Sequence, residues 1–195
     1  MNFNKHSDLA GSHAILSPSN YYWIRYDEEK LLQAYDARME AQRGTDYHAF
    51  AAMAIQLNVK LPESNKTINR YVNDGIGYLM KVEQPLRFSR NCFGTTDAIQ
   101  FRNNKLRIHD LKMGIVESSM DQLKVYMALF CYEYEQDPFE IDAELRIYQN
   151  DEIRVMSTDR SRDDKEFLDA DEIMHIQDKM VTFDRLIEQR RLELS

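Results

Sequence analysis

Apolar residues follow either helical or alternating spacing along most of the chain, and this pattern predicts its elements. Helical spacing predicts helices over residues 28–42, 45–58, a segment capped by Ser64, a segment starting at Ser118 or Ser119, and 169–192. Alternating or β-rich runs predict strands over 82–88, the two arms of 94–112, 143–148 and 153–157. Asn103-Asn104 and Asn150-Asp151 are turn signals within two expected hairpins.

The order of these elements is helices, three strands, a helix, two strands and a helix. This order predicts an α/β fold with a central mixed β-sheet flanked by helices. Pro85 in the first strand favours a position at the sheet edge. Two helices carry stripes that we expect to be buried, and their residues are Phe50, Met53, Ala54 and Leu57, then Ile173, Ile176, Met180, Phe183 and Ile187.

Composition is typical of a soluble globular protein. With 195 residues, 43% hydrophobic and 30% charged, we expect a single domain over 1–195, with residues 1–13 as a flexible tail. No apolar run has the length of a membrane span, and the first residues lack a signal core. Only Cys92 and Cys131 are present, which favours a reducing cytoplasm and no iron-sulfur cluster, since such a cluster needs about four cysteines.

Charge is unevenly distributed along the chain. The formal net charge is −8, which is unusual for a nucleic-acid enzyme. Residues 133–195 carry nine basic and nineteen acidic groups, whereas residues 85–112 carry six basic groups against two acidic ones. Local charge matters more than the total for contact with phosphate, so the basic stretch is the place to look for a nucleic-acid site.

The basic stretch also contains the residues with the strongest chemical signal. Side chains alternate faces along a strand, so Asp110 and Lys112 share a face, and a hairpin brings Asp97 to the same place. Burying two carboxylates beside an ammonium is costly unless they pair or bind a metal. Asp-x-Lys alone is common by chance, so the hypothesis of a catalytic site depends on the residues around it.

Together with those neighbours, the segment resembles the PD-(D/E)xK nuclease superfamily. The family's Asp after a glycine at the start of a strand is matched by Gly94 and Asp97, and its acid-x-Lys by Asp110 and Lys112. The similarity implies a restriction-endonuclease-like core that hydrolyses phosphodiester bonds.

Within that superfamily, the chain is similar to compact RecB-like nucleases encoded by bacteriophages. The Gln-x-x-x-Tyr of this branch is matched by Gln122 and Tyr126, and its early-helix histidine by His48. The four cysteines that many relatives use for an iron-sulfur clamp are absent. The similarity implies a DNA exonuclease of phage or bacterial DNA processing and recombination, acting in the bacterial cytoplasm.

The same resemblance implies roles for the individual residues. His48, Asp97, Asp110 and the Leu111 carbonyl would hold Mg²⁺ or Mn²⁺, and the histidine would favour Mn²⁺. Lys112 would orient water or stabilise negative charge, while Gln122 and Tyr126 would contact the DNA backbone or support Lys112. The expected partners are DNA ends or single strands, and a homo-oligomer or a recombination protein is a further expected partner.

Several alternatives stay open at this point. His48 is equally explained as a partly exposed helix histidine, and Tyr126 as a packing residue. Glu83 is either a solvated strand residue or an outer carboxylate, and His109 is expected to face away from Asp110 without a catalytic role. The protein as a whole could instead be a non-catalytic DNA-end-binding or regulatory protein, or a phage defence or counter-defence factor.

Overall fold

The structure is a computed structural model that describes residues 16, 18–161 and 166–194. The expected tail at 1–13 lies outside these residues. The chain divides into two compact units, residues 1–46 and 47–195. The first contains η2 (Pro18–Arg25) and the start of α1 (Glu28–Gln56), and the second contains the rest of α1 and every other described element.

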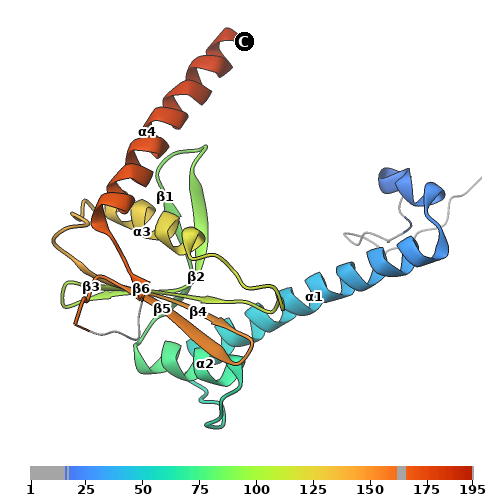
Figure 1. Ribbon diagram of the computed structural model, residues 1–195, viewed down its shortest axis with the longest axis horizontal. Helices are drawn as coiled ribbons and strands as arrows, with labels where there is room; N and C mark the ends of the chain where they lie inside the picture. The colour runs from blue at the N-terminus through green and yellow to red at the C-terminus, as the bar shows by residue number, and fades with distance from the viewer. Residues whose placement is uncertain (1–15, 17, 162–165, 195) are drawn as a thin grey trace, which may run out of the picture. The chain divides into compact units, whose positions relative to one another are not determined.

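The second unit is built on a six-stranded mixed sheet (Figure 1). Its strands lie in chain order, and they are β1 (Lys81–Arg87), β2 (Phe93–Arg102), β3 (Lys105–Leu111), β4 (Asp142–Gln149), β5 (Glu152–Ser157) and β6 (Glu166–Phe167). Neighbouring strands are antiparallel except β3 with β4 and β5 with β6, which are parallel. The expected α/β fold with a mixed sheet is therefore confirmed, and β6 is a short strand that the pattern did not predict.

Both predicted hairpin turns are present. Asn103 and Asn104 join β2 to β3 with φ values of 52° and 59°, and Asn150 and Asp151 join β4 to β5 with φ values of 52° and 60°. Asparagine and aspartate tolerate this left-handed backbone better than other side chains, and two such residues match the right-handed twist of a hairpin. Pro85 lies on edge strand β1, as expected.

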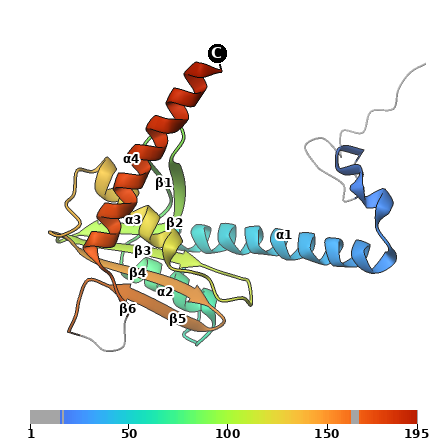
Figure 2. The same cartoon turned by 45° about the horizontal axis from the view of Figure 1, so that its top comes forward.

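Helices cover both faces of the sheet (Figure 2). On one face α3 (Asp121–Glu133) and α4 (Ala170–Glu193) pack over Ile99, Ile108 and Leu145. On the other, α2 (Thr67–Gly77) and the end of α1 pack over a second core that contains Leu111 and Tyr148. Strand β3 therefore contributes to both cores, and the crossover helix α3 links the parallel pair β3 and β4.

The prediction of two helices over 28–58 is wrong, because α1 is continuous through Gly44. A glycine in a helix interior costs only about 1 kcal/mol relative to alanine, which a long helix tolerates. The predicted buried stripe is correct only for Ala54, since Phe50, Met53 and Leu57 are exposed. Small residues of α1 are buried instead. Helices α1 and α2 approach closely here, since a Cβ added to Gly75 of α2 would lie only 2.6 Å from Ile55 Cδ1.

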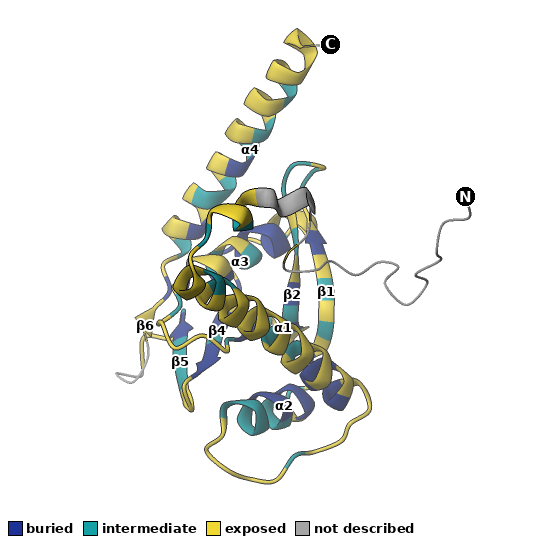
Figure 3. Cartoon of the chain, turned by 90° about the vertical axis from the view of Figure 1, so that its right-hand side faces the viewer, coloured by how far each residue is buried: buried dark blue, intermediate teal, exposed yellow. Residues whose placement is uncertain are grey.

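Helix α4 begins as predicted, with the Asp169 side chain accepting a hydrogen bond from the Asp171 N–H. Its predicted inward face is correct only for its first half. Ile173 and Met180 are buried, whereas Phe183 and Ile187 are exposed where the helix continues past the sheet (Figure 3). No described helix combines the length and the apolar composition that a membrane crossing needs.

Candidate active site

The predicted site residues meet where β2 and β3 run side by side beneath the start of α3. The register that pairs Ala98 with His109 places Asp97 level with Asp110 on the neighbouring strand. Side-chain alternation then directs both carboxylates to one face of the sheet. The hairpin and its turn, which the sequence specifies, therefore fix the separation of the two acids.

Lys112 bridges Asp110 to α3. Its Nζ lies 3.2 Å from Asp110 Oδ1 and 3.0 Å from Oδ2, and it donates to Gln122 Oε1 at 2.9 Å. The Lys112 N–H donates to the Tyr148 carbonyl, which continues the β3–β4 ladder by one residue. Gln122 was predicted either to contact the DNA backbone or to support Lys112, and this hydrogen bond is consistent with the support of Lys112.

Asp97 holds the other side of the site. Its Oδ2 accepts the Leu111 N–H at 2.9 Å and lies 3.3 Å from His48 Nδ1 at the C-terminal half of α1. The hydrogen bond to Asp97 raises the pKa of His48 above its ordinary value, against the lowering effect of burial. His48 is thus brought to the carboxylates rather than left as an isolated surface histidine.

Asp110 is held in an unfavourable environment for a charged group. Its side chain is buried, and burial together with the nearby Asp97 charge raises its pKa from 3.8 to about 6, despite Lys112. Within the described part of the chain, its Oδ2 is a buried oxygen with no hydrogen bond, since Lys112 approaches at an angle that makes only an ion pair. Because Oδ2 lies 3.0 Å from Lys112 Nζ it is ion-paired, and a carboxylate oxygen in such a pair keeps a lone pair that a further cation can use.

Tyr126 is fixed against the start of β2. Its hydroxyl donates to the Thr95 carbonyl at 2.6 Å. A Cβ added to Gly94 would lie 2.9 Å from Tyr126 Cε1, which is closer than two carbons can approach. The glycine before Asp97 therefore makes room for the ring, and Tyr126 has a positioning role for β2 that the sequence pattern did not predict.

The donor atoms suit a hard divalent cation. Carboxylate and carbonyl oxygens with one imidazole are the ligands that Mg²⁺ and Mn²⁺ accept. Among the described residues, however, no group of three His, Cys, Asp or Glu side chains is close enough to form a ready cage. The fit to a metal is therefore one of donor type, with Leu111 as the source of a backbone carbonyl.

Two neighbours of the site were not assigned from the sequence. Tyr71 of α2 is 2% exposed, and its ring packs edge-on against Tyr148. Burial, then the charges of Asp97, Asp110 and Glu83, raise the pKa of this tyrosine well above its usual value. Glu83 is exposed on β1 with a φ of 52°, and its negative charge is one of the causes of the raised pKa of Tyr71.

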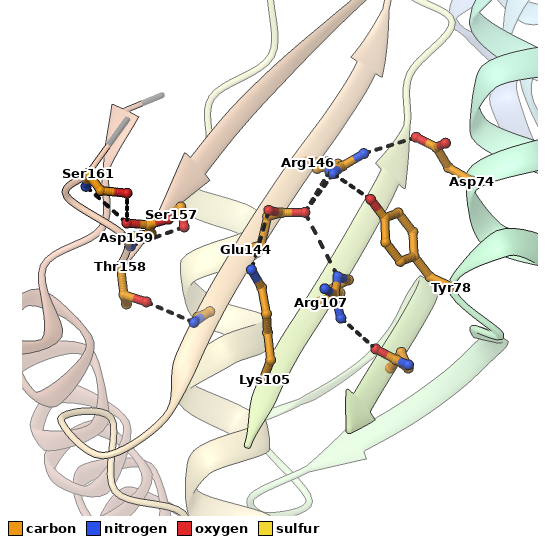
Figure 4. Close-up of polar contacts among 12 residues, drawn as sticks. Asp74, Tyr78, Lys105, Arg107, Glu144, Arg146, Ser157, Thr158, Asp159 and Ser161 are labelled. Atoms are coloured by element: carbon orange, nitrogen blue, oxygen red, sulfur yellow. Dashed lines mark hydrogen bonds and ion pairs between the residues drawn. The ribbon is translucent and has the colours of Figure 1, made fainter. Parts of the chain in front are cut away.

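The opposite face of the sheet carries a polar network behind the site (Figure 4). Arg146 donates to Asp74, Glu144 and the Tyr78 hydroxyl, at 2.9 Å each. His109 lies on this face, as expected from its position next to Asp110, and burial and Arg146 hold its pKa well below the usual range. Polar residues at alternate positions of the predicted strand 143–148 were the sequence signal for this network.

Comparisons with known proteins give no functional assignment. No protein-family model matches the chain, and no curated protein matches it. Among solved structures, a crystal structure of SSO0001 matches with 14% sequence identity and a TM-score of 0.38, over 84% of this chain and 68% of that chain. A similarity this distant carries no argument about function.

Proposed function

We propose that the protein is a Mg²⁺- or Mn²⁺-dependent deoxyribonuclease. The observation that carries the proposal is the gathering of Asp97 and Asp110 on β2 and β3 with Lys112, which directly follows β3 and lies 3.0 Å from a buried Asp110 oxygen. An Asp110 kept only for stability would be costly, because burial and Asp97 hold its pKa at about 6 even with Lys112 beside it.

The proposed metal ligands are His48, Asp97, Asp110 and the Leu111 carbonyl. When bound, the ion would activate water and relieve charge on the phosphate during phosphodiester hydrolysis. Asp97 aligns Leu111 by accepting its N–H, and Asp97 also orients His48. The cation would offset the burial of Asp110 and the like charge of Asp97, which together raise the pKa of Asp110 to about 6.

Lys112 is the proposed catalytic cation. Asp110 and Gln122 hold its ammonium from two elements, which fixes its position while leaving it able to face a phosphate oxygen. A preorganised cation of this kind stabilises negative charge that develops in the transition state. Gln122 acts through Lys112, and Tyr126 acts by positioning the start of β2.

The resemblance to compact RecB-like nucleases favours one form of this proposal. In that form the protein is an exonuclease that acts on DNA ends in phage or bacterial DNA processing. The proposed metal ligands and Lys112 would serve an endonuclease equally well. Linear, circular and single-stranded DNA, labelled and incubated with Mn²⁺, distinguish the two, because only an endonuclease opens a circle.

Substitution of Lys112 tests the proposal. Lys112→Ala should lower the cleavage rate by about a hundredfold or more, since it removes a few kcal/mol of transition-state stabilisation. Lys112→Met, which keeps the stem, should lose as much. DNA affinity in Ca²⁺ should change far less, because one cation supplies only part of the phosphate attraction. Equal cleavage by Lys112→Ala, or no cleavage by wild type in any metal, would overturn the proposal.

A further inference from the structure

A cavity of about 480 Å³ lies apart from the carboxylates, between the start of β1, the second half of β2 and the end of α3. None of Asp97, Asp110 and Lys112 lines it. Its volume is within the range of about 300–1,000 Å³ that is usual for small-molecule sites. The cavity is thus large enough for a planar ring and is not part of the proposed metal site.

Aromatic side chains form one part of its lining. The rings of Phe101 and Phe130 have centroids 5.1 Å apart, and those of Phe130 and Tyr134 are 4.9 Å apart. Phe101 is 40% exposed and Tyr134 is 46% exposed. Two of the three rings therefore offer surface that the fold leaves uncovered, and a flat ligand could stack on it.

The charged side chains that line the cavity are basic. Lys81 and Arg102 line the cavity with three glutamines, and none of the aspartates and glutamates in the described part of the chain does so. This is notable in a chain with 33 acidic residues and a net charge of −8. Cations beside aromatic rings and amides suit a ligand that has a flat, hydrogen-bonding ring joined to a negative group, as a nucleotide has.

Residues that line the cavity continue two rows of side chains that begin at the proposed active site, one along β2 and one along α3. Phe101 is four residues beyond Asp97 on the same face of β2, a separation of about 13 Å at 3.3 Å per residue. On α3, Gln122, Tyr126, Phe130 and Tyr134 follow at intervals of four along one side of the helix. At about 3.4 Å per stacked nucleotide, this separation corresponds to about four nucleotides, or fewer in an extended strand.

We propose that this cavity binds one base of a single-stranded nucleic acid, a few nucleotides from the bond that is cleaved. Tyr134 and Phe101 stack on the base, and Lys81 and Arg102 contact the adjoining phosphates. The inference rests on the proposed nuclease function, which it extends from the reacting phosphate to the recognition of a flanking nucleotide.

The test uses single-stranded DNA oligonucleotides in which one nucleotide at a time is replaced by an abasic residue. Affinity is measured by fluorescence anisotropy in Ca²⁺, with the full chain. In the wild type, an abasic residue at one position should weaken binding about tenfold, a typical loss for one base–aromatic stack. Tyr134→Ala should weaken binding of the intact oligonucleotide to the same extent, and the abasic residue should then cost nothing further.

Tyr132→Ala is the matched control, because Tyr132 is equally exposed at 46% on the same helix but packs against Phe88 outside the cavity. It should bind DNA as the wild type does. Arg102→Gln should weaken binding at every abasic position alike and reduce its dependence on salt.

The outcomes separate this inference from the function on which it rests. If wild type cleaves DNA but no abasic position matters, or Tyr134→Ala binds every oligonucleotide normally, the base pocket is wrong while the nuclease stands. A cavity used for an apolar peptide of a partner would give that result. If wild type neither binds nor cleaves nucleic acid, the proposed function fails first.

Discussion

At the scale of single residues, Asp110 illustrates the cost of building a site. A protonated or amidated side chain would suit its buried position, yet Asp97 adds a second negative charge level with it. Lys112 offsets only part of the penalty, because the pKa of Asp110 stays raised to about 6. The charged form of Asp110 is therefore unfavourable in the folded protein, and a bound cation would offset this cost.

This cost predicts a pH-dependent gain from Asp110→Asn. The unfolded chain ionises Asp110 near 3.8 but the folded protein near 6, so the stability that the neutral form contributes is lost as pH rises through this window. In urea unfolding with EDTA, the variant should match wild type near about pH 4 and exceed it by about 3 kcal/mol near pH 8. A difference that does not grow with pH would contradict a burial penalty at Asp110.

His48 should affect metal binding more than folding. Its pairing with Asp97 raises its pKa, so any stability from the charged pair is present below pH 6.5 and is lost as pH rises through the raised value. At about pH 8, where the imidazole is neutral, His48→Ala should weaken Mn²⁺ binding in calorimetry and leave the metal-free melting temperature nearly unchanged. Normal metal affinity with a large loss of stability would identify a packing histidine instead.

At the scale of elements, the start of β2 is held by a fit between Gly94 and Tyr126. The ring occupies the space where a Cβ at Gly94 would lie, and its hydroxyl donates to Thr95. Helix α3 is thereby fixed against the strand that carries Asp97. The glycine and the tyrosine, which are separate motif positions in the sequence, form one contact in the structure.

We expect Gly94→Ala to cost about 1–2 kcal/mol in chemical unfolding, because the added methyl overpacks against the ring and the ring must shift outward. Tyr126→Leu should remove the obstacle, so Gly94→Ala should cost much less in that background. An equal cost in both backgrounds would mean that backbone conformation at residue 94, rather than the ring, requires glycine.

What could be predicted from the sequence depends on how local the determining interaction is. The two hairpins follow from asparagine and aspartate turns, and the relation of Asp110 to Lys112 follows from strand alternation, so both were predictable. The buried face of α1 depends on its packing against Gly75 and its neighbours in another helix, which spacing within α1 does not reveal. The place of Tyr71 near the carboxylates is likewise a tertiary property.

At the scale of the whole unit formed by residues 47–195, the proposed site draws on four elements. His48 comes from α1, Asp97 from β2, Asp110 from β3 with Lys112 directly after it, and Gln122 from α3. Strand β3 also lies between β2 and β4 and contributes to both hydrophobic cores. An ion bound here would therefore connect elements whose separation accompanies global unfolding, rather than a loop that opens by itself.

This connection predicts that metal raises the melting temperature of the whole unit. A ligand that binds only the folded state stabilises it by about 2.7 kcal/mol at a hundred times its dissociation constant. For a domain of this size, that free energy corresponds to an increase of about 5–10 °C. Differential scanning calorimetry of EDTA-treated protein titrated with Mn²⁺ measures the shift. Asp110→Ala should abolish it, because it removes the oxygens in question, whereas Tyr132→Ala should retain it. The same shift in Asp110→Ala would place the ion elsewhere, and no shift in wild type would leave the buried carboxylate without the cation that the proposed function requires.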